Sequence, residues 1–162
     1  MSAHCYSRCW IHLIWGTLDR EKLLNKTAAA RVSRYLHEYA EDKGVYMKIN
    51  YVNAEHVYTL VDLPTAFSIE ELIQLLKGSS SHWVNSNDIV TGKFAWGRGY
   101  GAFSVSESNL DQVARYIANR EEHRTHLRGG TQRIYRSSRA MLEGRGKLLK
   151  RLCAFTMQIT PV

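Results

Sequence analysis

The residues best suited to chemistry form two small groups. His56 and Tyr58 lie two positions apart in an alternating segment, so both side chains face the same side of a predicted strand, about 6–7 Å apart. Tyr116 lies on a predicted amphipathic helix, and Asn119 and Arg120 follow at the i+3 and i+4 positions of its face. An imidazole can bind a metal, and a phenolic oxygen held by polar neighbours can attack phosphorus.

Each group also has an ordinary structural interpretation. A single histidine on a strand commonly belongs to a half-buried polar patch, and a helix tyrosine commonly packs at the edge of the core. Cys5, Cys9 and His12 do not have the ligand spacing of structural zinc sites. The glycines of residues 97–101 precede a predicted strand, so they indicate a tight bend or a close backbone approach and not a phosphate-binding loop.

Seven regular elements must position these residues. Hydrophobic periodicity and turn signals predict strands at 9–17, 45–52, 56–63 and 100–105, with helices at 27–43, from 69 to about 77, and from Ser106 or Ser108 onward. Gly44 is expected to end the first helix, and Ser68 with Glu71 forms a capping box for the second, which residues 78–81 either break or bend. Ser106 or Ser108 is expected to cap the third helix.

The order of these elements predicts the fold class. A β-α-β-β-α-β order is typical of the α+β ferredoxin-like fold, an antiparallel four-stranded sheet with two helices on one face. The short link at 53–55 predicts an antiparallel hairpin, and Val45, Met47, Ile49 and Tyr51 are expected on one face of its first strand. An additional C-terminal helix carries Tyr116, and that helix, a partner subunit or nucleic acid must cover the other face of the sheet.

Composition and charge favour one domain followed by a basic tail. The chain has 162 residues, of which 44% are hydrophobic, and Lys and Arg exceed Asp and Glu by 22 to 15. Residues 1–127 hold 14 residues of each sign, whereas residues 128–162 hold eight basic residues and one acid. We therefore predict a domain at 1–127 and a basic tail at 128–162. The tail indicates either a polyanionic partner such as nucleic acid or an ordinary solvated terminus.

The sequence also gives an expectation for the cellular location of the protein. No apolar stretch reaches the ~20 residues of a membrane span, and we expect no secretory signal peptide at the N-terminus. Three cysteines are an odd number, which argues against a disulfide framework. We expect a cytoplasmic, nucleoid-associated protein that does not interact with membranes.

Several stretches, taken together and in their order along the chain, resemble a known family. They lie between residue 10 and about residue 126, at 11–15 (IHLIW), 55–64 (EHVYTLVDLP), 68–80, 94–106 (FAWGRGYGAFSVS) and 116–123 (YIANREEH). On these motifs the chain is similar to the single-tyrosine HUH transposases of small insertion sequences, including their repeat-associated relatives.

The resemblance implies a DNA strand transferase that acts on single-stranded insertion-sequence ends folded into hairpins. Two histidines separated by one apolar residue would hold Mg²⁺ or Mn²⁺, helped by a polar residue, usually Gln, four positions after the tyrosine. The tyrosine would attack the DNA to give a 5′-phosphotyrosine link. The resemblance also implies a homodimer in which the tyrosine helix completes the partner's site.

Two positions of this chain depart from that pattern. His56 matches the first histidine and Tyr116 the nucleophile, but Tyr58 stands at the second histidine position and Arg120 at the Gln position. A neutral phenol is a poor ligand for Mg²⁺, and a guanidinium has no lone pair and repels a cation. We therefore expect the metal site to be weak or absent.

Three hypotheses follow from these residues. The first is an active strand transferase with Tyr116 as the nucleophile, and the second is a decayed or domesticated relative that binds hairpin DNA without cutting it. The third is an RNA-binding ferredoxin-like module, although the aromatic-and-glycine motif of such modules is absent. The tail is either an additional grip on DNA or an altered C-terminus. The predicted DNA contacts are Arg120, Arg133, Arg136, Arg139, Lys147, Lys150 and Arg151.

Overall fold

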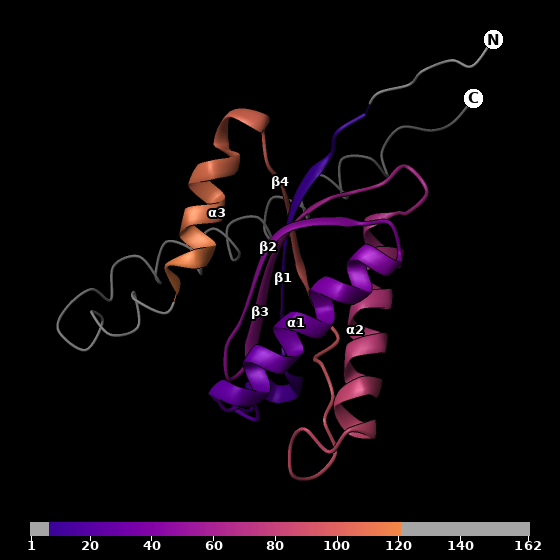
Figure 1. Cartoon of the computed structure of the whole chain (residues 1–162), viewed down its shortest axis with the longest axis vertical. Coiled ribbons are helices and arrows are strands. Elements are labelled where there is room, and N and C mark those ends of the chain that lie inside the picture. Colours follow the sequence, from indigo (N-terminus) through magenta and orange to yellow (C-terminus); the bar gives the residue numbers. More distant parts are fainter. Residues whose placement is uncertain (1–6, 121–162) are drawn as a thin grey trace, which may run out of the picture. The chain divides into compact units, whose positions relative to one another are not determined.

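The computed structural model describes residues 7–120. Its elements follow the predicted order (Figure 1), namely β1 (Trp10–Gly16), α1 (Lys26–Asp42), β2 (Tyr46–Val52), β3 (His56–Asp62), α2 (Ile69–Ser86), β4 (Gly101–Ser104) and α3 (Leu110–Ala118). Short 3-10 turns at Leu18–Arg20 and Glu107–Asn109 follow β1 and precede α3. Among the described residues no helix is long and apolar enough to cross a bilayer.

The four strands form one antiparallel sheet in the order β2-β3-β1-β4. This arrangement confirms the predicted ferredoxin-like α+β fold and the hairpin between β2 and β3. All seven residues of β1 pair with β3, from Trp10 opposite Asp62 to Gly16 opposite His56. The middle of the sheet is therefore a β1–β3 pair, and the residues of both strands that share a face become neighbours.

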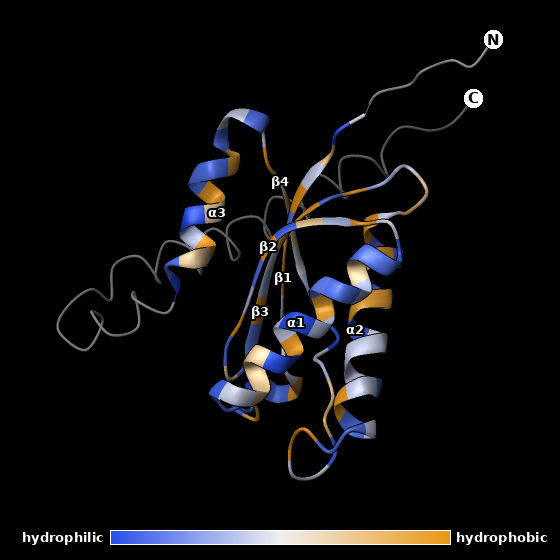
Figure 2. Cartoon of the chain, in the orientation of Figure 1, coloured by the Kyte–Doolittle hydropathy of each residue, from blue (hydrophilic) through white to orange (hydrophobic). Residues whose placement is uncertain are grey.

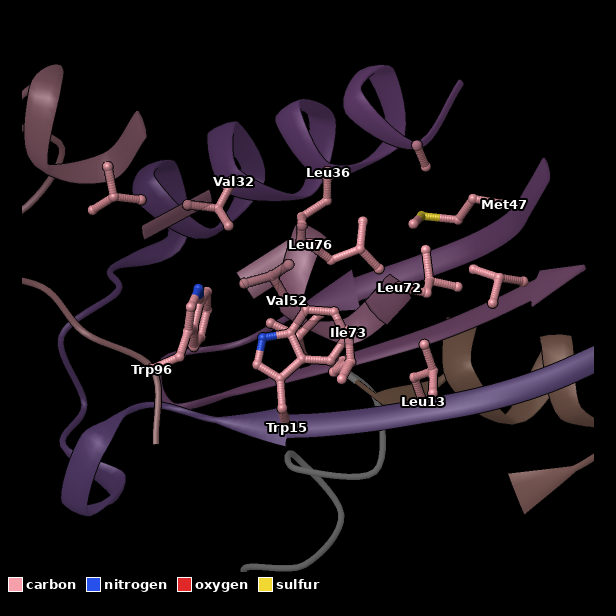
Figure 3. Close-up of a cluster of buried hydrophobic side chains, with 14 of the residues drawn as sticks. Leu13, Trp15, Val32, Leu36, Met47, Val52, Leu72, Ile73, Leu76 and Trp96 are labelled. Carbon is pink, nitrogen blue, oxygen red and sulfur yellow. The ribbon is translucent and has the colours of Figure 1, made fainter. Parts of the chain in front are cut away.

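The helices α1 and α2 cover one face of the sheet and enclose the larger hydrophobic core. Figure 3 shows Leu13 and Trp15 of β1 extending from the sheet toward Val32 and Leu36 of α1. These four side chains are almost completely buried, and burial of each stabilises the fold by roughly 1.5–3 kcal/mol. Apolar side chains of α2 complete this core, namely Leu72, Ile73, Leu76 and Val84.

The helix α3 covers part of the opposite face. Its buried residues Leu110 and Ile117 pack with Trp10 of β1 and Leu60 of β3 in a second, smaller cluster. In Figure 2 the hydrophobic side of α3 is turned toward the sheet and its hydrophilic side away from it. The helix that carries Tyr116 therefore covers part of the second sheet face, which is one of the predicted alternatives.

A bulge in β2 corrects the predicted alternation of that strand. Met47 pairs with Val61, but the next paired residue is Ile49, which lies opposite Leu60. The extra residue reverses the side on which the following side chains point. Met47 therefore belongs to the core beneath α1 and α2, whereas Ile49 and Tyr51 contact the cluster beneath α3.

The helix ends agree with the predicted signals in most places. Gly44 follows α1 with a φ of +69°, and Ser68 and Glu71 form both hydrogen bonds of the capping box at the start of α2. Residues 78–81 do not break α2, which continues as one helix to Ser86. The predicted serine cap of the last helix is wrong, because a 3-10 turn precedes α3 and Ser106 makes no capping side-chain bond there.

The segment before β4 is anchored from two sides. The indole Nε1 of Trp96 donates to Ser80 Oγ at 2.9 Å in the buried interior, and the Lys77 ammonium donates to the carbonyl oxygen of Gly97 at 2.6 Å. Gly97 also lies so close to Thr17 that a Cβ would meet its carbonyl oxygen at 3.2 Å. This is the close backbone approach that the glycine-rich sequence predicts.

We expect Ser80→Ala to lower the free energy of unfolding by about 1–3 kcal/mol, because the buried Trp96 Nε1 would lose its acceptor. Denaturant unfolding of both proteins measures the change. Ser81→Ala is the matched control on the same helix, since its hydroxyl donates at the surface to Gly78, and it should change stability by less than about 0.5 kcal/mol. Equal losses in the two variants would contradict the role of the Trp96 hydrogen bond.

Candidate functional site

The candidate site lies on the sheet face that α3 partly covers. Ile117 of α3 is fully buried against the sheet, which turns the preceding residue, Tyr116, to the flank of the helix. The Tyr116 side chain is 43% exposed, while its ring still lies 6.4 Å from the ring of His12 on β1. The phenol is therefore held beside the sheet and open to a ligand.

Arg120 joins the tyrosine helix to β3. Its guanidinium carbon lies 4.4 Å from the ring centroid of Tyr58 and 4.3 Å from that of Tyr116, and its Nη2 donates a hydrogen bond to the Tyr116 hydroxyl. A guanidinium over a ring face is attracted by the ring quadrupole. The structure thus brings together three residues that the sequence singled out, although they come from separate elements.

His56 stands at the edge of this group, at the start of β3. Its ring stacks with that of Tyr58 at 6.2 Å, and its Nδ1 lies 3.7 Å from the carboxylate of Glu55. A Cβ on the opposite residue, Gly16, would lie 3.1 Å from the Glu55 carbonyl oxygen and 3.3 Å from His56 Nε2, so a larger residue there would crowd the ring. His56 and Tyr58 therefore share one face, as the sequence predicts.

His12 also belongs to the site, although the sequence indicates it only as a poor candidate for a zinc ligand. It is only 8% exposed, and its Nε2 has no hydrogen-bond partner in the part of the chain that the structure describes. Burial, followed by the positive charge of Arg120, lowers the pKa of His12 from 6.5 to about 4. The ring is therefore neutral near pH 7, where it faces Tyr58, Phe103 and Tyr116.

Aromatic rings form a row across all four strands on this face. Tyr51 of β2 neighbours Tyr58 of β3, which neighbours His12 of β1, which neighbours Phe103 of β4, with centroids 6.3–6.4 Å apart. Flat rings of this kind can stack with unpaired bases of any type. Only the register of the sheet reveals the row, because the four residues are far apart in sequence and no local motif joins them.

The residues present do not fit a divalent metal. Enzymes of the family that the sequence resembles generally use one, yet residues 7–120 contain no group of three His, Cys, Asp or Glu side chains that could hold it. Of the predicted ligand positions, only His56 supplies a good donor atom. Tyr58 lies beneath the Arg120 guanidinium, whose positive charge opposes a cation at the same place.

Some predicted contacts lie outside the described residues. These are the tail residues Arg133, Arg136, Arg139, Lys147, Lys150 and Arg151. Asn119 ends α3 as its C-cap residue, with its backbone N–H bonded to the carbonyl of Arg115. Of the predicted site residues, His56, Tyr58, Tyr116 and Arg120 are therefore the ones that the structure places together.

Two solved structures have a similar fold. One comes from a protein assigned as a transposase of Deinococcus radiodurans R1, with a TM-score of 0.58, 24% identity, and coverage of 74% of this chain and 95% of the other. The second is a REP-associated tyrosine transposase bound to a REP hairpin, with a TM-score of 0.54, 12% identity, and coverage of 80% of this chain and 75% of the other. This chain therefore shares its fold with both of these proteins.

The sequence comparisons define the family. Residues 5–120 match the family model of IS200-like transposases, and the chain therefore belongs to this family. The ISDra2 transposase TnpA of Deinococcus radiodurans is 24% identical over 116 residues, which cover 68% of this chain and 83% of that protein. The resemblance inferred from the sequence motifs is thus confirmed.

The cause of the low His12 pKa can be tested by removing the charge of Arg120. In Arg120→Gln we expect the titration midpoint of His12, followed by NMR, to rise from about 4 but to stay below 6.5, because burial is the larger cause. Arg115→Gln removes the same charge from an exposed position of α3 and should leave the midpoint unchanged. A midpoint near 6.5 in the unmodified protein would contradict the burial of the ring.

The same shift has a consequence for stability. Because the folded-state pKa lies below the unfolded one, the unfolded chain binds the proton more readily between about pH 6.5 and pH 4. The free energy of unfolding should therefore fall as the pH is lowered through this window, by up to about 3 kcal/mol from His12. Denaturant unfolding of the unmodified protein and of His12→Phe at several pH values measures this contribution, because the variant lacks the titrating ring.

Proposed function

We propose that the protein cleaves and transfers single-stranded DNA ends folded into hairpins, with Tyr116 as the nucleophile. The observation that carries this proposal is the placement of Tyr116. Its phenol is accessible beside the sheet, and a guanidinium holds its hydroxyl within a group of rings suited to unpaired bases. Membership of the IS200-like transposases supports the proposal independently.

The proposed reaction is an exchange of phosphodiester partners. The Tyr116 oxygen attacks the scissile phosphorus, the bond from phosphorus to the 3′-oxygen breaks, and a 5′-phosphotyrosine link forms. The proton lost by the phenol balances the proton gained by the departing 3′-hydroxyl. A second 3′-hydroxyl then attacks the phosphotyrosine, which restores Tyr116 and completes the transfer.

The substrate and the assembly are part of the same proposal. A structural neighbour is bound to a REP hairpin, which supports hairpin DNA as the ligand class. We propose that Arg120 and the basic residues of the tail contact the DNA backbone, and that the chain acts as a homodimer in the cytoplasm, near the nucleoid. A single strand also suits the row of aromatic rings on the sheet face that α3 covers only in part.

The test of cleavage is a covalent adduct with DNA. We expect the full-length protein, incubated with an end-labelled single-stranded oligonucleotide that carries a hairpin flanking its gene, to form a species that survives denaturing electrophoresis. Tyr116→Phe should abolish this species, because no phenolic oxygen remains to attack phosphorus.

Tyr100→Phe is the matched control for this experiment. Tyr100 and Tyr116 are both 43% exposed, but Tyr100 precedes β4 and has no part in the proposed site. The adduct should therefore persist in this variant. An adduct that survives Tyr116→Phe would show that another residue is the nucleophile.

A second function is that the protein binds hairpin DNA without cutting it. The observation that favours it is the pair of departures at Tyr58 and Arg120, which leaves His56 as the one good metal donor among the predicted ligands. Under this alternative the fold and the DNA contacts persist while the chemistry is lost.

Restoring the family residues tests this alternative. We expect the double variant Tyr58→His, Arg120→Gln to bind Mn²⁺ more tightly than the unmodified protein, because it gains an imidazole and loses a repelling charge. Titration calorimetry measures the affinity, with His56→Ala added to the double variant as the control. No gain in affinity would argue against a decayed metal site.

A further inference from the structure

We propose that Arg120 is a fixed phosphate-binding residue which takes the place of a divalent metal, so that the protein binds single-stranded DNA beside Tyr116 without any metal ion. This inference deepens the proposed function and rests on its DNA ligand. It does not require that the DNA be cut.

The guanidinium is held in place before any ligand arrives. It lies between the rings of Tyr58 and Tyr116, at 4.4 and 4.3 Å from their centroids, and one of its nitrogens donates to the Tyr116 hydroxyl. A long side chain normally loses rotamer freedom when it binds a ligand. Two rings from two different elements have already removed much of that freedom, and the planar fork suits a phosphate.

The positive charge has no counter-charge within the described part of the chain. No carboxylate of residues 7–120 forms an ion pair with Arg120, and its Nε is buried there without an acceptor. An unsatisfied donor on a charged group is costly, and a phosphate oxygen is its natural partner. The site therefore already favours an anion over a cation.

The charge also acts on the centre of the site. Arg120 contributes to the lowered pKa of His12, which lies on β1 and also contacts the Tyr116 ring. The guanidinium thus places a positive charge between Tyr116 and the sheet, beside the position that a phosphate attacked by Tyr116 would take. Because an anion bound to Arg120 would weaken the effect of this charge, it should raise the pKa of His12.

The charge of Arg120 disfavours a metal ion at this place. A divalent cation near His56 and Tyr58 would meet the guanidinium at close range, which is unfavourable at any dielectric constant. The arginine supplies the same sign of charge as the metal and fixes it to the helix that carries the nucleophile. Tyr58 and Arg120, the two departures from the family pattern, thus act together: the Tyr58 ring holds the guanidinium that binds the phosphate.

The test measures DNA binding without metal. The probe is a fluorescent single-stranded oligonucleotide with a hairpin flanking the gene, and anisotropy is recorded with EDTA and with Mn²⁺. We expect equal affinity in the two buffers and a loss of at least about tenfold in Arg120→Gln. Arg120→Lys keeps the charge but not the planar guanidinium, and its DNA affinity should lie between that of the unmodified protein and that of Arg120→Gln.

Two controls separate this role from general charge and from misfolding. Arg115→Gln removes the same charge from the exposed side of α3 and should change the affinity less than about twofold. The thermal unfolding midpoint of Arg120→Gln shows whether the variant folds. In the unmodified protein, the NMR titration midpoint of His12 should rise when the oligonucleotide is added.

The outcomes distinguish this inference from strand transfer. Binding that needs Mn²⁺, or equal losses in Arg120→Gln and Arg115→Gln, would overturn the role of Arg120 while leaving a Tyr116 adduct possible. Conversely, Arg120-dependent binding in EDTA without any adduct would support this inference and reject cleavage. Absence of DNA binding in both buffers would overturn this inference together with the proposed ligand.

Discussion

The pairing of β1 with β3 is the interaction on which the rest of the molecule depends. It joins two strands over seven residue pairs at the middle of the sheet, and it fixes which side chains share a face. On one face it places Leu13 and Trp15 beneath α1 and α2, and on the other it places His12 beside Tyr58. A shift of one residue would exchange these two sets and destroy both the core and the site.

The bulge in β2 and the packing of α3 adapt this sheet to its second face. After the extra residue, Ile49 and Tyr51 point toward α3 and extend the apolar surface on which the helix lies. Burial of Leu110 and Ile117 against that surface fixes the rotation of α3. That rotation places Tyr116 beside His12 and Arg120 over Tyr58, on the two middle strands of the sheet. The site is therefore a consequence of how a short helix buries its apolar side.

The sequence predicts the local parts of this structure better than its long-range ones. Periodicity predicts the four strands and the three α-helices, although α2 extends to Ser86, beyond its predicted end near residue 77. The capping box at Ser68 is found as expected, because this signal depends on neighbouring residues. The bulge of β2 and the role of His12 could not be predicted. Both depend on which residues face each other across separate strands, and an isolated histidine in an apolar strand carries no such information.

Tyr58 and Arg120 are better understood as a matched pair than as two independent losses. Arg120 would be less favourable beside the family's histidine than beside Tyr58, since an imidazole at position 58 would present a protonatable ring to a permanent cation. An arginine without the Tyr58 ring would lose one of the two surfaces that hold it. In the proposed arrangement the Arg120 side chain would take the place of a metal ion, so that a permanent charge would stand where a removable one is otherwise bound. In the proposed function, such a site would be ready to bind a phosphate before DNA arrives, and the approach of the DNA to Tyr116 would then limit its chemistry.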